Sequence, residues 1–438
     1  MSSRRVCGLI PGARGPRLVT LELEDGRICA VHEGEQPPPD RRPYDRLARY
    51  LLLPGLVDAH AHSYSLPLRF RARLRPAPPP PAPGLEAALT QVWWPLDRVL
   101  TAEALELAAL LTAREALAGG VTTLFDHVAA PYAGPRGPAA VAAAYRRLGL
   151  RATLAWEVSD REGEARGAEL VDLHTGIPMT PLLRPMLGLH AAFTVGPATL
   201  ERAARTAQAL GIGVHVHLGE GPEDRRGSRL RYGADPWARL AASGLLDRPS
   251  VLAHAVDLTS GEWAAVAAEP RVWVITNPHS NLTNRVGTLP WERVPAAARV
   301  GVGTDGFAAG PAEAALLAGL LHAGARPPGA LWEANHALAA AVFDQPFGGL
   351  EPGAAADLVA VEPPFPFPRS IAEAWTRWAA GAGRRPPVRV YVAGEPVAAD
   401  GRPLHWPSGT RREAARVLAR MARAAWGAAP AHNEEAEP

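Results

Sequence analysis

The 438-residue chain is 47% hydrophobic and 21% charged, a composition typical of a folded globular protein with room for one large domain and a smaller one. Its formal net charge of +2 does not favour a nucleic-acid partner, and its two cysteines exclude a disulfide framework or a cysteine-rich metal site. All 46 basic residues are arginine, which excludes a metal bridge made by a carboxylated lysine and any lysine Schiff base.

The two ends of the chain predict one small β-domain. Residues 17–53 read as short strands broken by turns, with a hairpin at the "EDG" of residues 24–26, and the same texture returns at 355–362 and 388–403. We therefore expect a β-sandwich built from residues 1–52 and 350–405, flanking a hydrolase barrel over residues 53–349. Residues 406–438 are expected to form a C-terminal helix with an arginine-rich face, followed by a tail.

The middle of the chain predicts a (β/α)₈ barrel of the TIM type. Apolar strand-like runs alternate there with Ala/Leu-rich helical stretches, the pattern of a parallel sheet whose active site lies at the carboxyl ends of the strands. The proline-rich segment 73–84 is expected to form a stiff loop that could cover the barrel mouth. Eight strands are predicted, around residues 52–59, 121–125, 152–157, 186–189, 212–217, 251–253, 272–275 and 299–303.

Polar side chains stand at several of these strand ends. The first strand ends in "DAHAH", where strand alternation places His60 and His62 on one face, so that two imidazoles can share a metal ion. Each such residue alone has a plain structural explanation, such as a helix cap or a solvated loop charge, but together they indicate an active site. The later strands that end in this way carry His217 with Glu220, His254, and Asp305.

These motifs resemble those of the amidohydrolase superfamily. "PGLVDAHAH", "HVHLGEG", "LAHAVDL", "NPHSN" and "GVGTDG" follow one another as in the branch that holds cytosine deaminase, guanine deaminase and chlorotriazine hydrolase. "WEVSDREGE" and "NPHSNLTNRVG" are similar to the SsnA-type aminohydrolases, which are associated with purine catabolism. The resemblance implies one divalent metal ion, Zn²⁺ first and Fe²⁺ as the alternative, with the ligands His60, His62, His217 and Asp305.

The resemblance also implies the chemistry. Water on the metal would lose a proton near neutral pH and attack an amino-bearing carbon of a nitrogen heterocycle, in a purine or a related ring. Glu220 would protonate a ring nitrogen and then the departing amine, while Asp305 would accept a proton from the water. His254 would stabilise the developing oxyanion. The expected enzyme is a hydrolase of non-peptide C–N bonds, a deaminase of cyclic amidines.

The residues that contact the substrate are less constrained by the sequence. His190 ends the fourth strand and matches a substrate-facing histidine of this branch. Trp93, with Trp94, could form an aromatic wall or simply pack in the core. His279 stands where the SsnA-type pattern has an acidic residue, so it is placed beside the pocket and leaves the identity of the substrate open. Asp126, His127 and His215 are expected to support the metal ligands.

Two other functions remain open at this point. The same barrel could dechlorinate or N-dealkylate a triazine ring, or it could be a binding protein without catalysis. We expect a small heterocyclic substrate, no nucleic-acid or membrane partner, and a homodimer. A cytoplasmic location is expected because the N-terminus lacks a signal-like apolar run and no segment reaches about 18 uncharged apolar residues.

Overall fold

The barrel predicted from the sequence is present. A computed structural model describes residues 3–69, 84–306, 310–321, 326–381 and 385–427. Eight strands follow chain order around the barrel, each parallel to the next. They are β5 (Leu56–Ala61), β6 (Val121–Val128), β7 (Arg151–Val158), β8 (Leu183–Ala191), β9 (Val214–Leu218), β10 (Ser250–His254), β11 (Val272–Thr276) and β12 (Val300–Val302).

The barrel closes between its first and last strands. The backbone N–H groups of Thr304 and Asp305 both donate to the carbonyl oxygen of His60, each at 2.9 Å. The N–H of His62 donates in return to the carbonyl oxygen of Asp305 at 3.3 Å. Residues almost 250 positions apart in the sequence are thereby fixed side by side by backbone hydrogen bonds.

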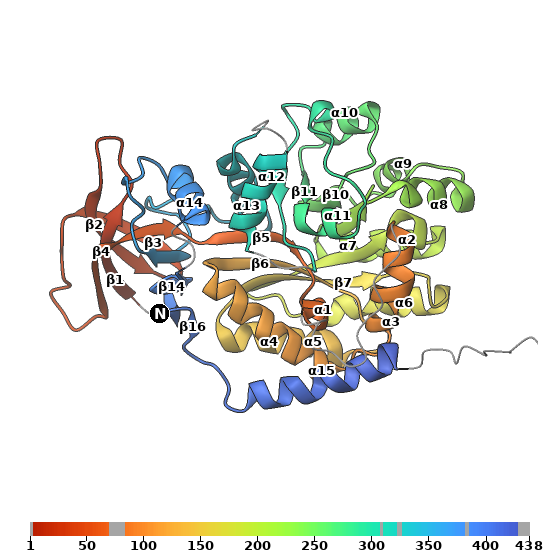
Figure 1. The fold of residues 1–438 in the computed structure, drawn as a ribbon, viewed down its shortest axis with the longest axis horizontal. Coiled ribbons are helices and arrows are strands. Elements are labelled where there is room, and N and C mark those ends of the chain that lie inside the picture. Colours follow the sequence, from red (N-terminus) through yellow and green to blue (C-terminus); the bar gives the residue numbers. More distant parts are fainter. Residues whose placement is uncertain (1–2, 70–83, 307–309, 322–325, 382–384, 428–438) are drawn as a thin grey trace, which may run out of the picture.

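Helices cover the outside of the barrel (Figure 1). Local sequence explains several of their starts: the Thr101 side chain accepts from the N–H of Ala104, and Thr259 and Glu262 form a reciprocal capping box. The helices between strands are α4 (Ala102–Ala118), α5 (Arg136–Leu148), α6 (Glu164–Asp172), α7 (Pro197–Leu210), α8 (Pro222–Tyr232), α9 (Pro236–Ala242), α10 (Ser260–Ala268) and α11 (Pro278–Thr283), and α12 (Pro311–Leu321) and α13 (Pro328–Phe343) follow β12.

Several short helical elements connect the strands and helices of the barrel, and further helices follow it. No helix among the described residues is long and apolar enough to cross a membrane. The short elements are η1 (Ser63–Ser65), α1 (Leu66–Arg69), α2 (Leu85–Ala88), the π-helical turn η3 (Leu89–Trp93), α3 (Trp94–Asp97), η4 (Leu173–Gly176), η5 (Ala192–Thr194) and η6 (Trp291–Arg293), and the later helices are α14 (Ile371–Ala380) and α15 (Thr410–Trp426).

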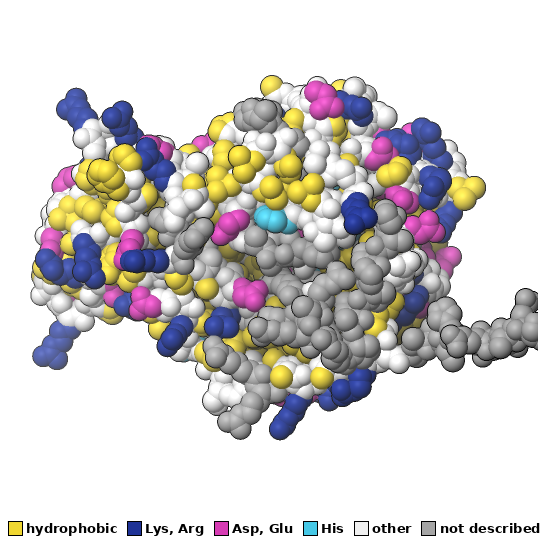
Figure 2. Space-filling model, viewed as in Figure 1, with side chains coloured by type: hydrophobic (Ala, Val, Ile, Leu, Met, Phe, Trp, Pro, Cys, Tyr) yellow, Lys and Arg dark blue, Asp and Glu magenta, His cyan; other side chains and the backbone are white. Residues whose placement is uncertain are grey.

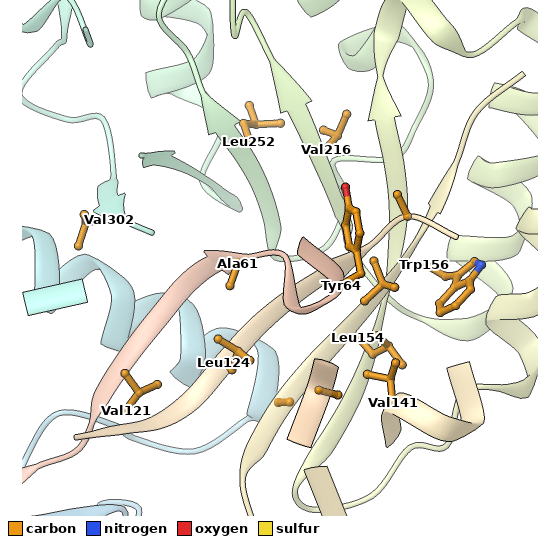
Figure 3. Packing of buried hydrophobic residues seen from close by; sticks show 14 of the residues in the cluster. Ala61, Tyr64, Val121, Leu124, Val141, Leu154, Trp156, Val216, Leu252 and Val302 are labelled. Carbon is orange, nitrogen blue, oxygen red and sulfur yellow. The ribbon is translucent and has the colours of Figure 1, made fainter. Parts of the chain in front are cut away.

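Strand alternation divides the core into an inner and an outer layer. Phe125 of β6 and Ala155 of β7 belong to a cluster inside the barrel. Their neighbours Leu124, Leu154 and Trp156 point the other way and pack against the covering helices, as Figure 3 shows. A residue that follows an inner-layer residue by two positions therefore also points into the barrel, nearer to its carboxyl end.

A bulge in β5 sets the direction of its two histidines. Asp58 pairs with Leu124 of β6, but the next paired residue, Ala61, faces Asp126, so three steps on β5 match two on β6. Ala59 lies in the inner cluster and Ala61 in the outer one. The bulge turns His60, which lies between these two alanines, to the inner side as well.

Strand alternation alone therefore does not explain the side-chain directions in "DAHAH", residues 58–62. His60 and His62 share the inner face, as predicted, but Asp58 does not share it with them. Its carboxylate accepts from the Thr304 backbone N–H at 3.1 Å and from the Thr304 hydroxyl at 2.6 Å. It also lines a separate cavity between the barrel wall and helices α4 and α12. Asp58 thus stabilises the contact between β5 and the segment after β12 that closes the barrel.

The flanking β-domain is built from both ends of the chain, as expected. Its eight strands form one sheet in the order β16-β15-β14-β13-β4-β1-β2-β3, and they lie side by side at the left of Figure 1. Strand β1 pairs in parallel with β4, and the other pairs are antiparallel. The strands are β1 (Ser3–Ile10), β2 (Arg17–Glu24), β3 (Arg27–Glu33), β4 (Tyr44–Pro54), β13 (Leu358–Val361), β14 (Arg389–Val392), β15 (Glu395–Ala399) and β16 (Arg402–Pro403).

Two details of this domain bear on the sequence predictions. The predicted "EDG" hairpin joins β2 to β3 through a two-residue turn, in which Asp25 and Gly26 have φ values of 50° and 78°. The predicted strand at 52–59 is instead two strands, because β4 ends at Pro54 and β5 begins at Leu56. Gly55 separates them, and a Cβ there would come within 2.1 Å of the Thr122 hydroxyl.

The C-terminal helix is also present. In α15, Val417 and Met421 are buried in the main core, and Arg420 reaches Glu103 of α4 with an N–O distance of 2.5 Å. The tail beyond residue 427 and the proline-rich segment 73–83 lie outside the described residues, so the predictions for them stay predictions. Gly84 precedes helix α2.

Candidate active site

Three imidazoles and one carboxylate meet at the carboxyl end of the barrel. His62 Nε2 lies 3.2 Å from His217 Nε2 and 3.2 Å from Asp305 Oδ1. His60 Nε2 lies 4.0 Å from the same carboxylate oxygen. All four side chains are buried, with no more than 6% of any residue exposed. The four residues predicted as metal ligands are therefore brought together.

Backbone carbonyls fix the orientation of two of these rings. His62 Nδ1 donates to the carbonyl oxygen of His127 at 2.5 Å, and His217 Nδ1 donates to that of His190 at 2.6 Å. With the proton on Nδ1, each Nε2 presents a lone pair to the centre of the site. Burial lowers the pKa of His217 to about 3, so the ring is neutral at physiological pH, as a metal ligand must be.

His60 is held by another histidine. Its Nδ1 lies 2.7 Å from Nε2 of His215, which occupies the same face of β9 as His217. His60 Nε2 is buried and has no hydrogen-bond partner among the described residues. Buried polar atoms rarely stay unpaired. The unpaired lone pair of His60 lies close to three other possible metal-ligand atoms, so the arrangement fits a bound divalent cation. Ligand atoms of His60, His62 and Asp305 lie within 4.8 Å of one another.

His254 stands between two carboxylates. Its Nε2 lies 3.6 Å from Asp305 Oδ2 and 3.9 Å from Glu220 Oε2, while its Nδ1 lies 2.8 Å from Asn281 Oδ1. The backbone is left-handed at both His254 and Asp305, with φ values of 80° and 54°. Left-handed backbone at non-glycine residues costs of order 1–3 kcal/mol each and is often found at functional sites.

Glu220 follows β9 and reaches the same cavity. Its side chain is 12% exposed. Burial raises the pKa of Glu220 and outweighs the lowering effect of His254. A carboxyl group with a raised pKa is suited to hold and release a proton near neutral pH.

The site opens into a cavity of about 390 Å³, counted out to its mouth. Of the predicted substrate-binding residues, His190 and Trp93 line the cavity, as does Trp94. His279 lies in α11, half-buried, and is not among the described lining residues. The lining comprises His62, Tyr64, Leu89, Trp93, Trp94, Asp97, Glu157, His190, His217, Glu220, His254, Asn284 and Asp305.

His190 presents a hydrogen-bond acceptor to this cavity. The Thr194 hydroxyl donates to the carbonyl oxygen of Ala191 at 3.0 Å, so it accepts from His190 Nδ1, 2.9 Å away. The proton of the ring then sits on Nδ1 and leaves the lone pair on Nε2. Burial lowers the pKa of His190 well below its usual range, which keeps the ring neutral.

The predicted supporting residues contact the segment that carries the ligands. Asp126 accepts from the backbone N–H and the hydroxyl of Ser63, at 2.8 and 2.6 Å, and from the hydroxyl of Tyr145. Ser63 directly follows His62, so Asp126 fixes the turn in which that ligand lies. His127 supplies the carbonyl oxygen that orients the same ring.

Sequence reasoning missed a second polar group in the cavity. Glu157 and Asp97 both line it, and both bind Arg161. Glu157 ends strand β7, so the rule that found His190 and His254 would have found it too. No local signal marks Asp97, because its place depends on how the short helices between residues 85 and 97 pack beside the barrel.

Comparison with known proteins agrees with this architecture. Residues 51–397 match the model of the amidohydrolase family. A 5-methylthioadenosine/S-adenosylhomocysteine deaminase from Teredinibacter turnerae is 33% identical over 382 residues, covering 81% of each chain. Enzymes of the same name from Desulforudis audaxviator and Moorella thermoacetica are 34% and 33% identical, but the matches span only 50% and 57% of their length.

Solved structures share the fold. An adenosine deaminase from Xanthomonas campestris with bound zinc has a TM-score of 0.76 at 23% identity, covering 96% of this chain and 98% of that one. An atrazine chlorohydrolase from Arthrobacter aurescens complexed with zinc has a TM-score of 0.77 at 20% identity, covering 95% and 100%. At these identities the likeness concerns the fold alone. The family model spans most of the chain, and the chain belongs to the amidohydrolase family.

Proposed function

We propose that this protein is a metal-dependent hydrolytic deaminase of an amino-substituted nitrogen heterocycle, with an adenine-type ring as the leading candidate. The observation that carries the proposal is the convergence of Glu220 and His254 on the cavity that holds the ligand cluster. The names of the relatives support the adenine-type ring. The face drawn in Figure 2 mixes basic and acidic side chains, which fits a small-molecule substrate better than a nucleic acid.

His60, His62, His217 and Asp305 would hold the metal ion. Neutral imidazoles and one carboxylate suit Zn²⁺ best, with Fe²⁺ as the alternative, and the set has no thiolate or lysine. When bound, such an ion lowers the pKa of water and stabilises negative charge that develops on oxygen. The side chains around it have to move the protons.

Glu220 would carry protons to the leaving group. An amine on an aromatic ring leaves poorly unless it is protonated, and Glu220 lies in the cavity beside His254. Its carboxyl would give a proton to a ring nitrogen, recover a proton from the added water, and give that proton to the departing amine. Ammonia and the ring carbonyl compound are the products.

His254 and His190 would hold the ring and its new oxygen. His254 would hydrogen-bond through Nε2 to the oxygen added at the reacting carbon, and the side chains of Asp305 and Glu220 lie beside that nitrogen at 3.6 and 3.9 Å. His190, with its lone pair on Nε2, would accept a hydrogen bond from an N–H of the ring. Trp93 supplies an aromatic surface beside His62, with ring centroids 6.0 Å apart.

The test is ammonia release by the metal-loaded protein from adenine nucleosides and free aminated heterocycles, compared with the Glu220→Gln variant. Glutamine keeps the size of the side chain but cannot transfer the proton, so kcat should fall about a hundred-fold or more with metal content unchanged. Glu223→Gln is the matched control, because Glu223 lies one turn along the chain and is not among the described lining residues. Near wild-type deamination by Glu220→Gln would remove Glu220 from the mechanism and with it the main support for a deaminase.

A further inference from the structure

Two acids that line the cavity on the side of β7, Asp97 and Glu157, both bind Arg161 and form an acid–arginine cluster with it. Arg161 Nη2 donates to Asp97 Oδ2 at 2.8 Å and to Glu157 Oε1 at 3.1 Å. The three side chains are only 2–5% exposed. Two carboxyl groups thus share a single nitrogen of one guanidinium inside the molecule.

This acid–arginine cluster keeps unused hydrogen-bonding atoms. Arg161 Nη1 and Asp97 Oδ1 are buried, and neither has a hydrogen-bond partner among the described residues. Glu157 Oε2 lies 3.8 Å from His127 Nδ1, too far for a hydrogen bond. Leaving a buried polar atom unpaired costs about 1–3 kcal/mol, so the two unpaired atoms of Arg161 and Asp97 point to a missing partner.

The acid–arginine cluster lies on the far side of the barrel from the strands that lead to His254 and Asp305. In a closed barrel of eight strands β7 stands opposite β11, whose neighbours β10 and β12 lead to His254 and Asp305. Glu157 follows the inward-facing Ala155 by two positions on β7, so its carboxyl points into the barrel mouth. A ring whose amino-bearing carbon faces His254 would present its other edge to Glu157.

The acid–arginine cluster is also rigid. The Arg161 guanidinium lies over the ring of Trp94, 5.0 Å from its centroid, and its Nε donates to the Ser159 hydroxyl at 3.0 Å. Trp94 in turn packs edge-on against His190, with centroids 6.3 Å apart. A fixed donor–acceptor set discriminates between ligands more strongly than mobile surface charges, because a poorly matched ligand leaves its atoms unpaired.

We propose that Glu157, assisted by Asp97 and held in position by Arg161, selects substrates that carry hydrogen-bond donors on the ring edge opposite the reacting carbon. This inference rests on the proposed deamination. The substrate class is a heterocycle whose far edge bears an amino group, a ring N–H or a hydroxyl. Rings with N-alkyl or other apolar groups at that edge, as in alkylated triazines, would leave the acid–arginine cluster unpaired.

The protonation state of Glu157 also lets it meet a ring edge that carries both donors and acceptors. Burial raises the pKa of Glu157 to about 8, against the lowering effect of Arg161. At neutral pH the carboxyl would therefore be largely protonated, able both to donate to and to accept from an N–C=N or N–C=O edge. Asp97, which also lines the cavity, adds an acceptor.

The test uses two heterocycles that are identical at the reacting amino group and differ only in an amino or a methyl group at the same carbon of the far edge. These two groups have nearly the same size, so steric effects cancel. For the metal-loaded wild type we expect kcat/KM and affinity for the amino compound to be about a hundred-fold or more higher. Glu157→Leu should reduce that ratio at least tenfold, and Glu157→Gln should restore part of it.

The control and the readout separate this inference from the proposed function. Glu162→Leu removes a carboxylate five residues along the chain that binds Arg98 and Tyr132 outside the cavity lining, and it should leave the ratio unchanged. Dissociation constants measured by calorimetry test selection even if no compound releases ammonia, an outcome that would refute deamination alone. Equal binding of the two compounds to the wild type, binding of neither, or a ratio unaffected by Glu157→Leu would overturn the role of Glu157.

Discussion

The role of each histidine in the site depends on the group to which its Nδ1 atom is hydrogen-bonded. His62 and His217 each donate a hydrogen bond from Nδ1–H to a backbone carbonyl oxygen. The Nε2 atom of each ring therefore presents a lone pair to the metal site. His190 donates a hydrogen bond from Nδ1–H to the Thr194 hydroxyl and presents the lone pair of Nε2 to the cavity. The same residue type thus becomes a candidate ligand or a candidate substrate contact according to where the barrel places it.

We expect one equivalent of zinc or iron per chain, because the ligand set of His60, His62, His217 and Asp305 surrounds a single point. Elemental analysis of the purified protein should give this ratio. Removal of the ion by a chelator should abolish turnover, and one equivalent of Zn²⁺ should restore it. Two equivalents per chain, both needed for turnover, would contradict a mononuclear centre.

Replacing His190 by alanine should raise KM more than it lowers kcat. Its lone pair would contact the ring in the ground state and the transition state alike, so the loss is one of uniform binding, on the order of tenfold. His279→Ala serves as the comparison, since His279 is not among the described residues that line the cavity, and it should leave KM unchanged. The assignment fails if KM is unchanged in His190→Ala or rises equally in both variants.

At the scale of elements, the turn between β9 and α8 positions Glu220. Asp224 lies in the first turn of α8, is 1% exposed, and accepts from the backbone N–H of Gly219 at 2.7 Å. This bond ties the start of the helix to the residue just before Glu220. Glycine fits at position 219, where φ is 58°.

Asp224→Asn should make the protein more stable than the wild type at pH 8 and change it little at pH 4. Burial raises the pKa of Asp224 to about 7, so the folded state binds the proton more tightly than the unfolded chain does. The contribution of Asp224 to stability therefore falls as pH rises from about 4 to 7, whereas asparagine stays neutral and keeps the acceptor for Gly219.

The measurement is the midpoint of thermal unfolding for both proteins across this pH range. Asp235→Asn is the opposite case, because its hydrogen bond with Arg229 lowers the pKa of Asp235. The stability that Asp235 contributes is lost as pH falls, so its replacement should bring no gain at pH 8. If the difference between Asp224→Asn and the wild type did not change with pH, the Asp224 carboxyl would not be protonated in the folded state.

At the scale of the whole molecule, one buried ion pair joins the barrel to the β-domain. Arg151, at the start of β7, donates from Nε and Nη2 to both oxygens of Asp357, each at 2.9 Å. The two side chains are 2% and 3% exposed. The guanidinium also lies 5.2 Å from the ring centroids of Phe343 and Phe347, and the backbone N–H of Ala393 donates to Asp357 at 2.8 Å.

Asp357→Asn should lower the free energy of unfolding by about 3–5 kcal/mol, because it leaves the Arg151 guanidinium buried without its counter-charge. Chemical denaturation measures the change. Glu362→Gln is the surface control: the Arg385–Glu362 pair has the same chemistry at 2.7 Å, but its side chains are 75% and 52% exposed, so its loss should cost less than about 1 kcal/mol. Similar small losses in both variants would show that the buried pair does not stabilise the junction.

Much of the fold follows from local sequence. Eight apolar runs spaced by helical stretches predicted the barrel, "EDG" predicted a hairpin, and the spacing of Val417 and Met421 predicted α15, because each pattern reflects contacts within a few residues. The strand near residues 52–59 was misread as one element. An uninterrupted apolar run does not show that its two halves belong to different sheets. The strand pairing reveals the break, because β4 pairs with β1 and β13 whereas β5 pairs with β6.

The sequence by itself determined the family, the kind of barrel and the residues that meet at its mouth, because histidines and acids at successive strand ends must converge once the strands are parallel. The tertiary structure alone decided the rest. The bulge in β5 depends on pairing with β6, and the tautomers depend on carbonyls of distant strands. Asp97 of α3 and Glu157 of β7 line one cavity and share Arg161 only in the folded barrel. Such contacts depend on the closed barrel, and no local pattern along the chain encodes them.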